Sequence, residues 1–354
     1  MKLFQNNPVV LDGDNLVACI DVEEHIRLSV YDAIEQYVNE NDTSNINLIV
    51  IGIAEAFLQM DRRGPFSFFT NIAKRFKHST YINANIHIKD CFKRYTWFEN
   101  NFDTLHCYPY AFNNRTIYRL TQLGDINKVV DYDSMEPDRH AIFYNAVPLN
   151  TRAFLIDRLH KTGSIENTYY SWLLRKDFDP EVIKDWDDKI KFFDWRNVKV
   201  LDMKTSELIL GISQDKVDDD LYFNKTIFEL AVETCPGEYE LMYTEKTWKP
   251  LLMGKLFFIL GSHDYYKNLK NMGFELYDEI FDYYFDGIVE HDERLNKFHN
   301  SLEKVLTTDI NTLLDKVRSI KEKILYNKNL ALSIDTKDPI IDRYKFFNKD
   351  QMTK

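Results

Sequence analysis

Cysteine, glycine-rich loops and long apolar runs are all scarce in this chain of 354 residues. Its four cysteines, at positions 19, 91, 107 and 235, show neither metal-ligand nor disulfide spacing, so we expect reduced thiols in a cytoplasmic protein. No run approaches the roughly 18 apolar residues that a membrane-spanning helix needs. The first residues are too polar for a signal peptide. We therefore expect no membrane partner.

The common chemical motifs are also missing. There is no P-loop, no G-x-G-x-x-G, no G-x-S-x-G nucleophile elbow, and no metal-ligand spacing among the nine histidines. Three D-x-D triplets match a metal–diphosphate signature, but aspartate is abundant here and none clearly follows a buried apolar strand. They are Asp12–Asp14, Asp131–Asp133 and Asp185–Asp187. We expect no metal ion and no cofactor.

The length of the chain indicates how many domains it forms, and its charge limits which partners it can bind. A chain of 354 residues fits two domains, and 44% hydrophobic residues can fill two cores. The net charge of −11 argues against nucleic-acid binding over the whole surface. Residues 56–120, however, hold ten basic and four acidic groups, a net charge of +6 that leaves −17 for the rest. This asymmetry indicates a positively charged surface on the first half.

Hydrophobic periodicity predicts an α/β protein. In the first half we expect strands at Leu16–Ile20, Leu48–Ile53 and Tyr81–Ile88, and helices at Glu24–Asn39 and Phe66–Phe76. The polar stretch Asp125–His140 predicts a boundary, with domains at 1–135 and 136–325. In the second domain we expect a strand at Ala141–Asn145, a helix at Arg152–Lys161, strands at Phe228–Val232 and Leu256–Leu260, and helices towards the C-terminus.

The stretch Tyr222–Ser262 carries the chemistry. Two short apolar strands enclose a break and a helix that starts near YTEKTW, which is the usual phosphate-binding unit of an open α/β sheet. Thr244 or Thr247 can cap the helix, and Pro250 should lie within its first turn. Glu245 and Lys246 then lie at the helix N-terminus, where free N–H groups attract a diphosphate. The alternative is a surface helix start whose Glu and Lys are merely solvated.

The segments FELAVET, YTEKTWKPLLMG and LFFILGS, in this order, resemble the donor-site motif of α1,3-fucosyltransferases. They are closer still to glycosyltransferases of tailed phages. The resemblance implies the GT-B fold: two Rossmann-like domains that face each other across a cleft, with a nucleotide sugar held by the second. It also implies that residues 326–354 cross back to the first domain.

The same resemblance implies roles for individual residues. Glu245 and Lys246 would hold the ribose and the diphosphate of the nucleotide, and Glu233 would line this donor site with Thr244. We expect a nucleotide diphosphate sugar as co-substrate, with a uridine diphosphate sugar favoured over a guanosine diphosphate sugar.

The strand–turn–helix unit at the start of the second domain resembles the first such unit of the same families. By this match Arg152 is the arginine that meets the diphosphate, and Asn145 is a loop contact. The families often have His-Arg at this helix start, and Thr151 departs from that pattern. An arginine at a helix start is otherwise more often an ordinary surface residue.

A metal-independent transfer needs cations and helix N-termini to stabilise the leaving group, and Arg152 and Lys246 can supply charge. An inverting transfer also needs a carboxylate to take the acceptor proton. Our candidate is Glu55, at the carboxyl end of a predicted strand, followed by Asp61. The alternative is that both are ordinary loop carboxylates, and a retaining enzyme requires no such base.

Aromatic and basic residues alternate in the positive segment. Its acceptor-binding candidates are Arg62, Arg63, Lys93 and Arg94. Stacking faces with cations fit a flipped base in double-stranded DNA, so one hypothesis is transfer to 5-hydroxymethylcytosine in phage DNA within the host cytoplasm. The alternatives are a fucosyltransferase-like enzyme acting on a saccharide or glycan, and a non-enzymatic nucleic-acid-binding protein with a decayed transferase fold. The aromatic residues can also be read simply as core.

Overall fold

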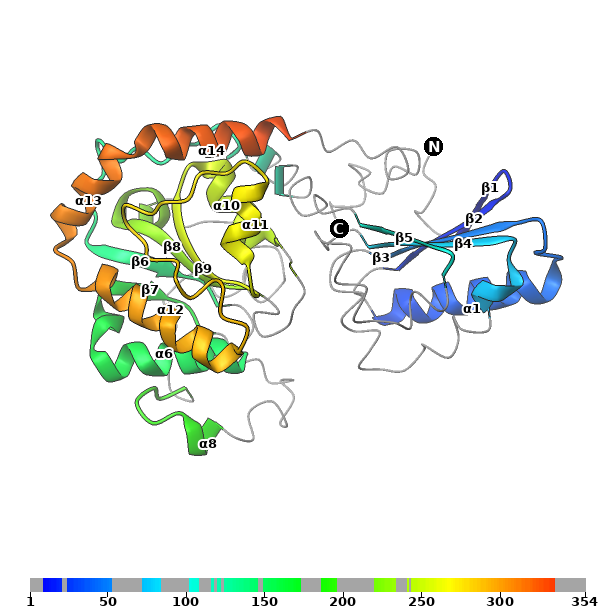
Figure 1. Ribbon diagram of the computed structural model, residues 1–354, viewed down its shortest axis with the longest axis horizontal. Coiled ribbons are helices and arrows are strands. Elements are labelled where there is room, and N and C mark those ends of the chain that lie inside the picture. Colours follow the sequence, from blue (N-terminus) through cyan, green and yellow to red (C-terminus); the bar gives the residue numbers. More distant parts are fainter. Residues whose placement is uncertain are drawn as a thin grey trace. The chain divides into compact units, whose positions relative to one another are not determined.

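The computed structural model describes residues 9–20, 24–52, 72–83, 102–107, 116–117, 120–121, 124–145, 149–172, 186–195, 220–233, 241 and 243–334. The chain is α/β and divides into two compact units, drawn in Figure 1. The first lies within Met1–Tyr118, with the stretch Glu240–Tyr243, and the second within Arg119–Tyr239 and Thr244–Ile334. No described helix is both long enough and apolar enough to span a membrane.

The first unit has a five-stranded sheet in the order β1-β2-β3-β4-β5. Strand β1 pairs antiparallel with β2, and all the other pairs are parallel. The elements are β1 Val9–Asp12, β2 Asn15–Ile20, α1 Glu24–Glu40, β3 Asn47–Gly52, a 3₁₀ turn at Ala73–Arg75, β4 His78–Asn83 and β5 Thr104–Cys107.

Apolar periodicity explains these elements. Leu16, Val17 and Ala18 of β2 are all buried, as expected of a parallel strand covered on both faces. Helix α1 buries Val30, Ile34 and Val38, one residue per turn. The predicted helix Glu24–Asn39 and the first two predicted strands are confirmed to within one or two residues. Of the predicted helix Phe66–Phe76, residues 66–71 lie outside the described part of the chain, and Ala73–Arg75 form a 3₁₀ turn. The third strand begins at His78, three residues earlier than predicted, and residues 84–88 lie outside the described part of the chain.

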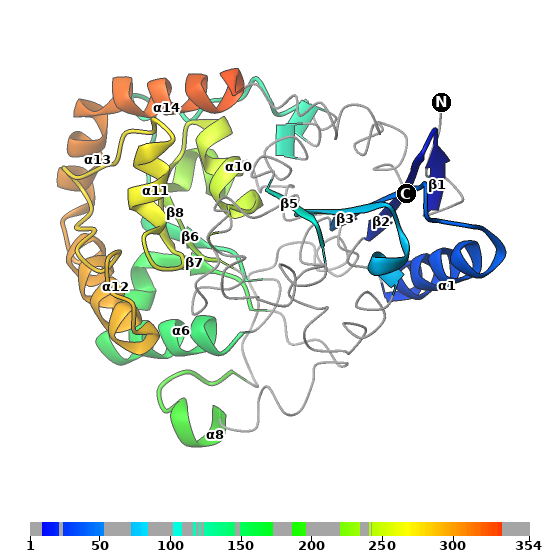
Figure 2. The same ribbon diagram turned by 45° about the vertical axis from the view of Figure 1, so that its right-hand side comes forward.

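The second unit has a four-stranded parallel sheet in the order β7-β6-β8-β9. Helices α6 and α12 lie on one face of this sheet, and α10 and α14 lie on the other (Figures 1 and 2). The elements are β6 Arg139–Phe143, α6 Asn150–Thr162, a 3₁₀ turn at Ser164–Asn167, β7 Thr168–Tyr170, α8 Trp186–Lys189, a π-helical turn at Leu221–Lys225, β8 Thr226–Val232, α10 Glu245–Met253, β9 Leu256–Leu260, α11 Tyr265–Asn271, α12 His291–Leu306, α13 Ile310–Ser319 and α14 Lys321–Ser333.

The strand order of the second sheet contains a reversal. From β6 the chain adds β7 on one side, and β8 then pairs with β6 on its other side. The helices that follow β6 and β8 therefore leave towards opposite faces of the sheet. In open α/β sheets such a switch point opens a crevice at the carboxyl ends of the two strands, and ligands bind there. The end of β8 and the start of α10 are the place to look for a site.

Residues at the edges of the predicted second domain pack on its sheet. The Tyr132 hydroxyl donates to the Ile227 carbonyl at 3.2 Å and accepts the Leu256 N–H at 2.6 Å, so it ties β8 to β9. Residues 124–135, which the sequence analysis assigned to the first domain, thus contact the second sheet. Near the other end, the ammonium of Lys328 in α14 donates to the Lys128 carbonyl at 3.0 Å. Residues 335–354 lie outside the described residues.

Candidate functional site at the switch point

Strand β8 leads directly into the site. All seven of its residues are buried, and the predicted strands Phe228–Val232 and Leu256–Leu260 are both confirmed. Helix α10 begins after Thr244, whose hydroxyl accepts the Lys246 N–H at 3.4 Å as an N-cap. Of the two threonines that the sequence offered as a cap, Thr244 is the one used. The first turn of α10 therefore faces the carboxyl edge of the sheet.

The prediction for Pro250 was wrong. It is the sixth residue of α10 and lies in the second turn rather than the first. A proline there has no N–H for the carbonyl four residues earlier, that of Lys246. Helix α10 still begins at Glu245, because the Thr244 cap and the buried Glu233 carboxylate, described next, hold its first turn.

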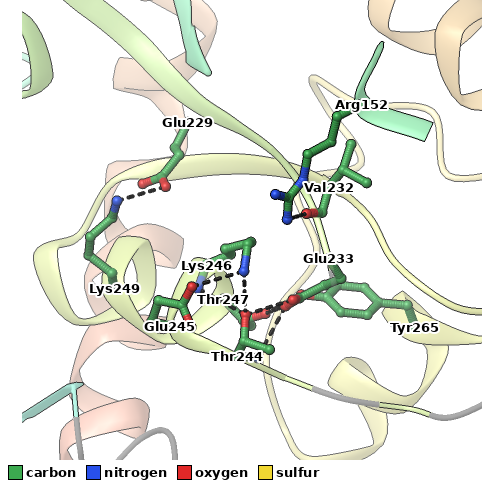
Figure 3. A network of polar contacts seen from close by, with 10 residues as sticks. All are labelled: Arg152, Glu229, Val232, Glu233, Thr244, Glu245, Lys246, Thr247, Lys249 and Tyr265. Carbon is green, nitrogen blue, oxygen red and sulfur yellow. Dashed lines mark hydrogen bonds and ion pairs between the residues drawn. The ribbon is translucent and has the colours of Figure 1, made fainter. Parts of the chain in front are cut away.

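Glu233, one residue beyond β8, fastens the helix start to the sheet (Figure 3). One carboxylate oxygen accepts the Thr244 N–H at 3.2 Å and the Thr247 hydroxyl at 2.8 Å, and the other accepts the Thr244 hydroxyl at 2.6 Å. The Thr247 hydroxyl also bonds to the Tyr265 hydroxyl. Burial raises the pKa of Glu233, against the opposing attraction of the Lys246 cation and the threonine hydrogen bonds. Both carboxylate oxygens thus serve the protein's own backbone and hydroxyls.

Lys246 brings a positive charge to the same helix end. Its ammonium lies 2.8 Å from a Glu245 carboxylate oxygen and 3.3 Å from the Thr244 hydroxyl. The side chain is only 13% exposed. Burial works against the charge, but the carboxylates of Glu245 and Glu233 outweigh it, so the pKa of Lys246 is raised. Lys246 is therefore a cation at neutral pH at the N-terminal, positive end of the α10 dipole. The N–H groups of Lys246, Thr247 and Trp248 bond to Thr244, so the sequence expectation of free N–H groups does not hold for these three.

Arg152 approaches from the opposite face of the sheet. It is the third residue of α6, and its guanidinium donates to the Val232 carbonyl, the last residue of β8, at 3.1 Å (Figure 3). Its side chain is buried, and its charge opposes the protonation of Lys246, which places the two cations in one electrostatic environment. Asn145, two residues past β6, is also buried and donates its backbone N–H to the Ser171 hydroxyl at 2.9 Å.

The structure therefore brings together the predicted residues on β8, α10 and α6 at one edge of one sheet. The other candidates lie outside the described residues: Glu55, Asp61, Arg62, Arg63, Lys93 and Arg94. Within the described ranges, no group of three or more His, Cys, Asp or Glu side chains is placed to hold a metal ion.

Sequence reasoning missed a buried ion pair beside the site. The Lys249 ammonium lies 2.9 Å from the Glu229 carboxylate, which also accepts the Tyr222 hydroxyl at 2.8 Å. Glu229 on β8 and Glu233 just past its end are four residues apart, so both side chains point to the same side and contact α10 or its N-cap. The signal was present in FELAVE, where two glutamates share one face of an apolar strand. Lys255, at the other end of α10, donates to the carbonyls of Tyr222 and Thr226, and burial lowers its pKa well below the usual range.

This arrangement can bind an anion. The buried Arg152, the largely buried Lys246 and the positive end of a helix dipole surround the end of one strand, and pre-oriented groups of this kind stabilise phosphate charge without reorganisation. Comparisons with family models, with curated proteins and with solved structures find no match to this chain.

Proposed function

We propose that this protein is a GT-B glycosyltransferase that moves a sugar from a nucleotide diphosphate sugar to a hydroxyl acceptor. One observation carries the proposal: Arg152 from α6 and Lys246 from α10 approach the end of β8 from opposite faces of the sheet, at its switch point. A switch point with one helix start, the buried Arg152 and the largely buried Lys246 suits a diphosphate.

The chemistry follows from the charges. Breaking the bond between the sugar and the diphosphate leaves a second negative charge on the terminal phosphate of the leaving nucleoside diphosphate. Lys246 and Arg152 would stabilise that charge as it develops, and the positive end of the α10 dipole would add to their field. Glu233 would keep this turn in place, since its carboxylate binds the Thr244 backbone and hydroxyl.

The acceptor that we propose is 5-hydroxymethylcytosine in DNA. It rests on the net charge of +6 and the aromatic residues of segment 56–120. The assay incubates the protein and a mixture of nucleotide sugars with a duplex containing hydroxymethylated cytosine, with a plain cytosine duplex as the matched control. Sugar on the hydroxymethylated duplex alone is expected. Transfer to an oligosaccharide and to neither duplex would make a glycan the acceptor.

The donor is tested by binding. A thermal-shift or calorimetric panel of uridine and guanosine diphosphate sugars should stabilise the protein, with the uridine series stronger. A ligand at 100 times its Kd adds about 2.7 kcal/mol of stability, which a melting curve resolves easily. Binding by none of the nucleotide sugars would refute the proposal.

A further inference from the structure

Three buried polar atoms at the same edge of the second sheet have no hydrogen-bond partner among the described residues. They are Asn145 Oδ1, Trp172 Nε1 and Ser262 Oγ, in side chains that are 0%, 2% and 3% exposed. Each residue lies two positions past the carboxyl end of its strand: β6 for Asn145, β7 for Trp172 and β9 for Ser262. These three unpaired atoms therefore lie at the edge where open α/β sheets bind ligands, whereas another, Thr168 Oγ1, lies at the amino end of β7.

Unpaired buried atoms are unusual. Nearly all buried polar groups are hydrogen-bonded, because an unmade bond costs the full desolvation of the group. Buried serines elsewhere in this unit follow the rule: Ser171 accepts the Asn145 N–H at 2.9 Å, and Ser301 donates to the Asp282 carbonyl at 2.6 Å. Ser262 is the exception among these serines, so its hydroxyl is a candidate to pair with a bound ligand.

The loop that carries Ser262 is held in place. A Cβ atom at Gly261 would lie 2.2 Å from the Tyr265 ring, so only glycine allows this ring to pack there. Tyr265 in turn donates its backbone N–H to the Ser262 carbonyl at 3.3 Å, and its hydroxyl bonds to Thr247 in the helix that carries Lys246. Ser262 is thus fixed relative to the proposed diphosphate site.

The type of atom limits what the ligand group can be. The side-chain carbonyl of Asn145 only accepts hydrogen bonds, and an ionised phosphate has no proton to donate. The Asn145 side-chain amide lies 3.4 Å from the Phe143 carbonyl, which leaves the oxygen as the unpaired end. Its partner must be a hydroxyl or an N–H. The Ser262 hydroxyl can donate or accept, so a hydroxyl-rich group can pair with both.

We propose that Asn145 and Ser262 hydrogen-bond sugar hydroxyls of a bound nucleotide sugar, an inference that rests on the proposed function. Strands β6 and β9 both pair with β8, so the two side chains flank its end. There Glu233 donates its N–H to the Leu260 carbonyl at 3.0 Å, and Arg152 reaches Val232. The cations would take the diphosphate, and Asn145 and Ser262 the sugar beside it.

The test compares Ser262→Ala with Ser301→Ala, two buried serines of which only one has a partner. Calorimetry measures the binding of a nucleotide sugar and of the matching nucleoside diphosphate, and urea unfolding measures stability. Ser262→Ala should weaken binding about three- to tenfold, the worth of one neutral hydrogen bond, with no loss of stability. Ser301→Ala should lose stability and bind as wild type does.

Comparing the nucleotide sugar with the nucleoside diphosphate shows whether Ser262 contacts the ribose or the transferred sugar. Weaker binding of both would identify a ribose hydroxyl as the partner, and weaker binding of the nucleotide sugar alone would identify the transferred sugar. Asn145→Ala, which keeps its backbone bond to Ser171, should show the same pattern. Unchanged affinity in Ser262→Ala, or a loss of stability equal to that of Ser301→Ala, would overturn this inference while the proposed function stands. A wild-type protein that binds no nucleotide sugar would overturn both.

Discussion

The two units share a parallel-sheet layout but bury different side chains. In the part of the first unit that the structure describes, the buried polar residues are the uncharged Thr43, Ser79 and Thr116. Every buried charged residue in the described ranges belongs to the second unit. These residues are Arg152, Asp157, Glu229, Glu233, Lys249, Lys255, Asp286, Arg294 and Lys328. Burying a charge is costly unless it is paired, so among the described residues this cost falls on the second unit.

Strand order explains where that cost falls. The described parallel strands of the first sheet follow one another in chain order, and the second sheet reverses between β6 and β8. Only the reversal sends successive helices to opposite faces and brings their N-terminal ends to one strand end. The buried charges Arg152 and Glu233 lie at that end, with the largely buried Lys246. The comparison thus separates a sheet whose described residues include no buried charge from one that gathers three charged side chains at the end of a strand.

The largest expected effect tests the buried ion pair. Glu229→Ala leaves the Lys249 ammonium buried without its carboxylate, and should lower the free energy of unfolding by about 3–5 kcal/mol. Urea unfolding measures it. The double variant Glu229→Ala with Lys249→Ala should lose less than the two single losses added, because the pair is coupled. A loss near the roughly 1 kcal/mol of an exposed pair would contradict the assigned role.

The next effect concerns function. Lys246→Ala and Arg152→Ala should each lower kcat/KM by about 100- to 1000-fold, or about 2.7–4 kcal/mol of transition-state stabilisation, because each removes a cation from the leaving group. Lys267→Ala is the control, since this exposed lysine on α11 pairs with Asp264. Near-wild-type turnover in both Lys246→Ala and Arg152→Ala would place the donor elsewhere.

Much of this site was predictable because it is local in sequence. The apolar runs at Phe228–Val232 and Leu256–Leu260 have a single sensible interpretation, and a threonine before Glu-Lys is a common helix cap. The position of Pro250 in the helix was predicted wrongly because proline is typical of a first turn. The true start depends on Glu233, a tertiary contact that the helix sequence does not contain.

Other features are invisible in a sequence for physical reasons. The reversal in strand order is a choice of neighbours between segments far apart in the chain, and apolar periodicity does not encode it. Strand β4 begins at His78, but the prediction began at Tyr81 because His78 and Ser79 are polar and give no hydrophobic signal. Ser79 is buried only because Asp103 accepts its N–H at 2.7 Å and its hydroxyl at 3.0 Å. The pairing of Glu229 with Lys249 likewise requires the helix to be docked.

A pH prediction sharpens the comparison. Burial raises the folded-state pKa of Glu233, so the folded protein holds this proton more tightly than the unfolded chain. The contribution of Glu233 to stability therefore falls as pH rises from the unfolded pKa, about 4.5, through the folded value. Glu233→Gln lacks this titration and can still bond Thr244 and Thr247. Measured by urea unfolding, its stability relative to wild type should improve between pH 4 and pH 7. A pH-independent difference would contradict the burial argument.

The smallest expected effect on stability is that of Asp103→Asn in the first unit. The same carboxylate-to-amide change at Glu229 in the second unit gives the comparison. Asp103 joins β4 to β5 through Ser79, but its side chain is 56% exposed, and water can replace what a substitution removes. Asp103→Asn should therefore change the free energy of unfolding by about 0.5 kcal/mol or less. Glu229→Gln, the same carboxylate-to-amide change at a side chain that is 3% exposed, should cost several times more because the buried Lys249 ammonium loses the negative charge that it pairs with. Chemical denaturation of the two variants in parallel gives the ratio. Equal losses would mean that burial does not distinguish the two sheets, and that the concentration of charge in the second unit has no energetic consequence.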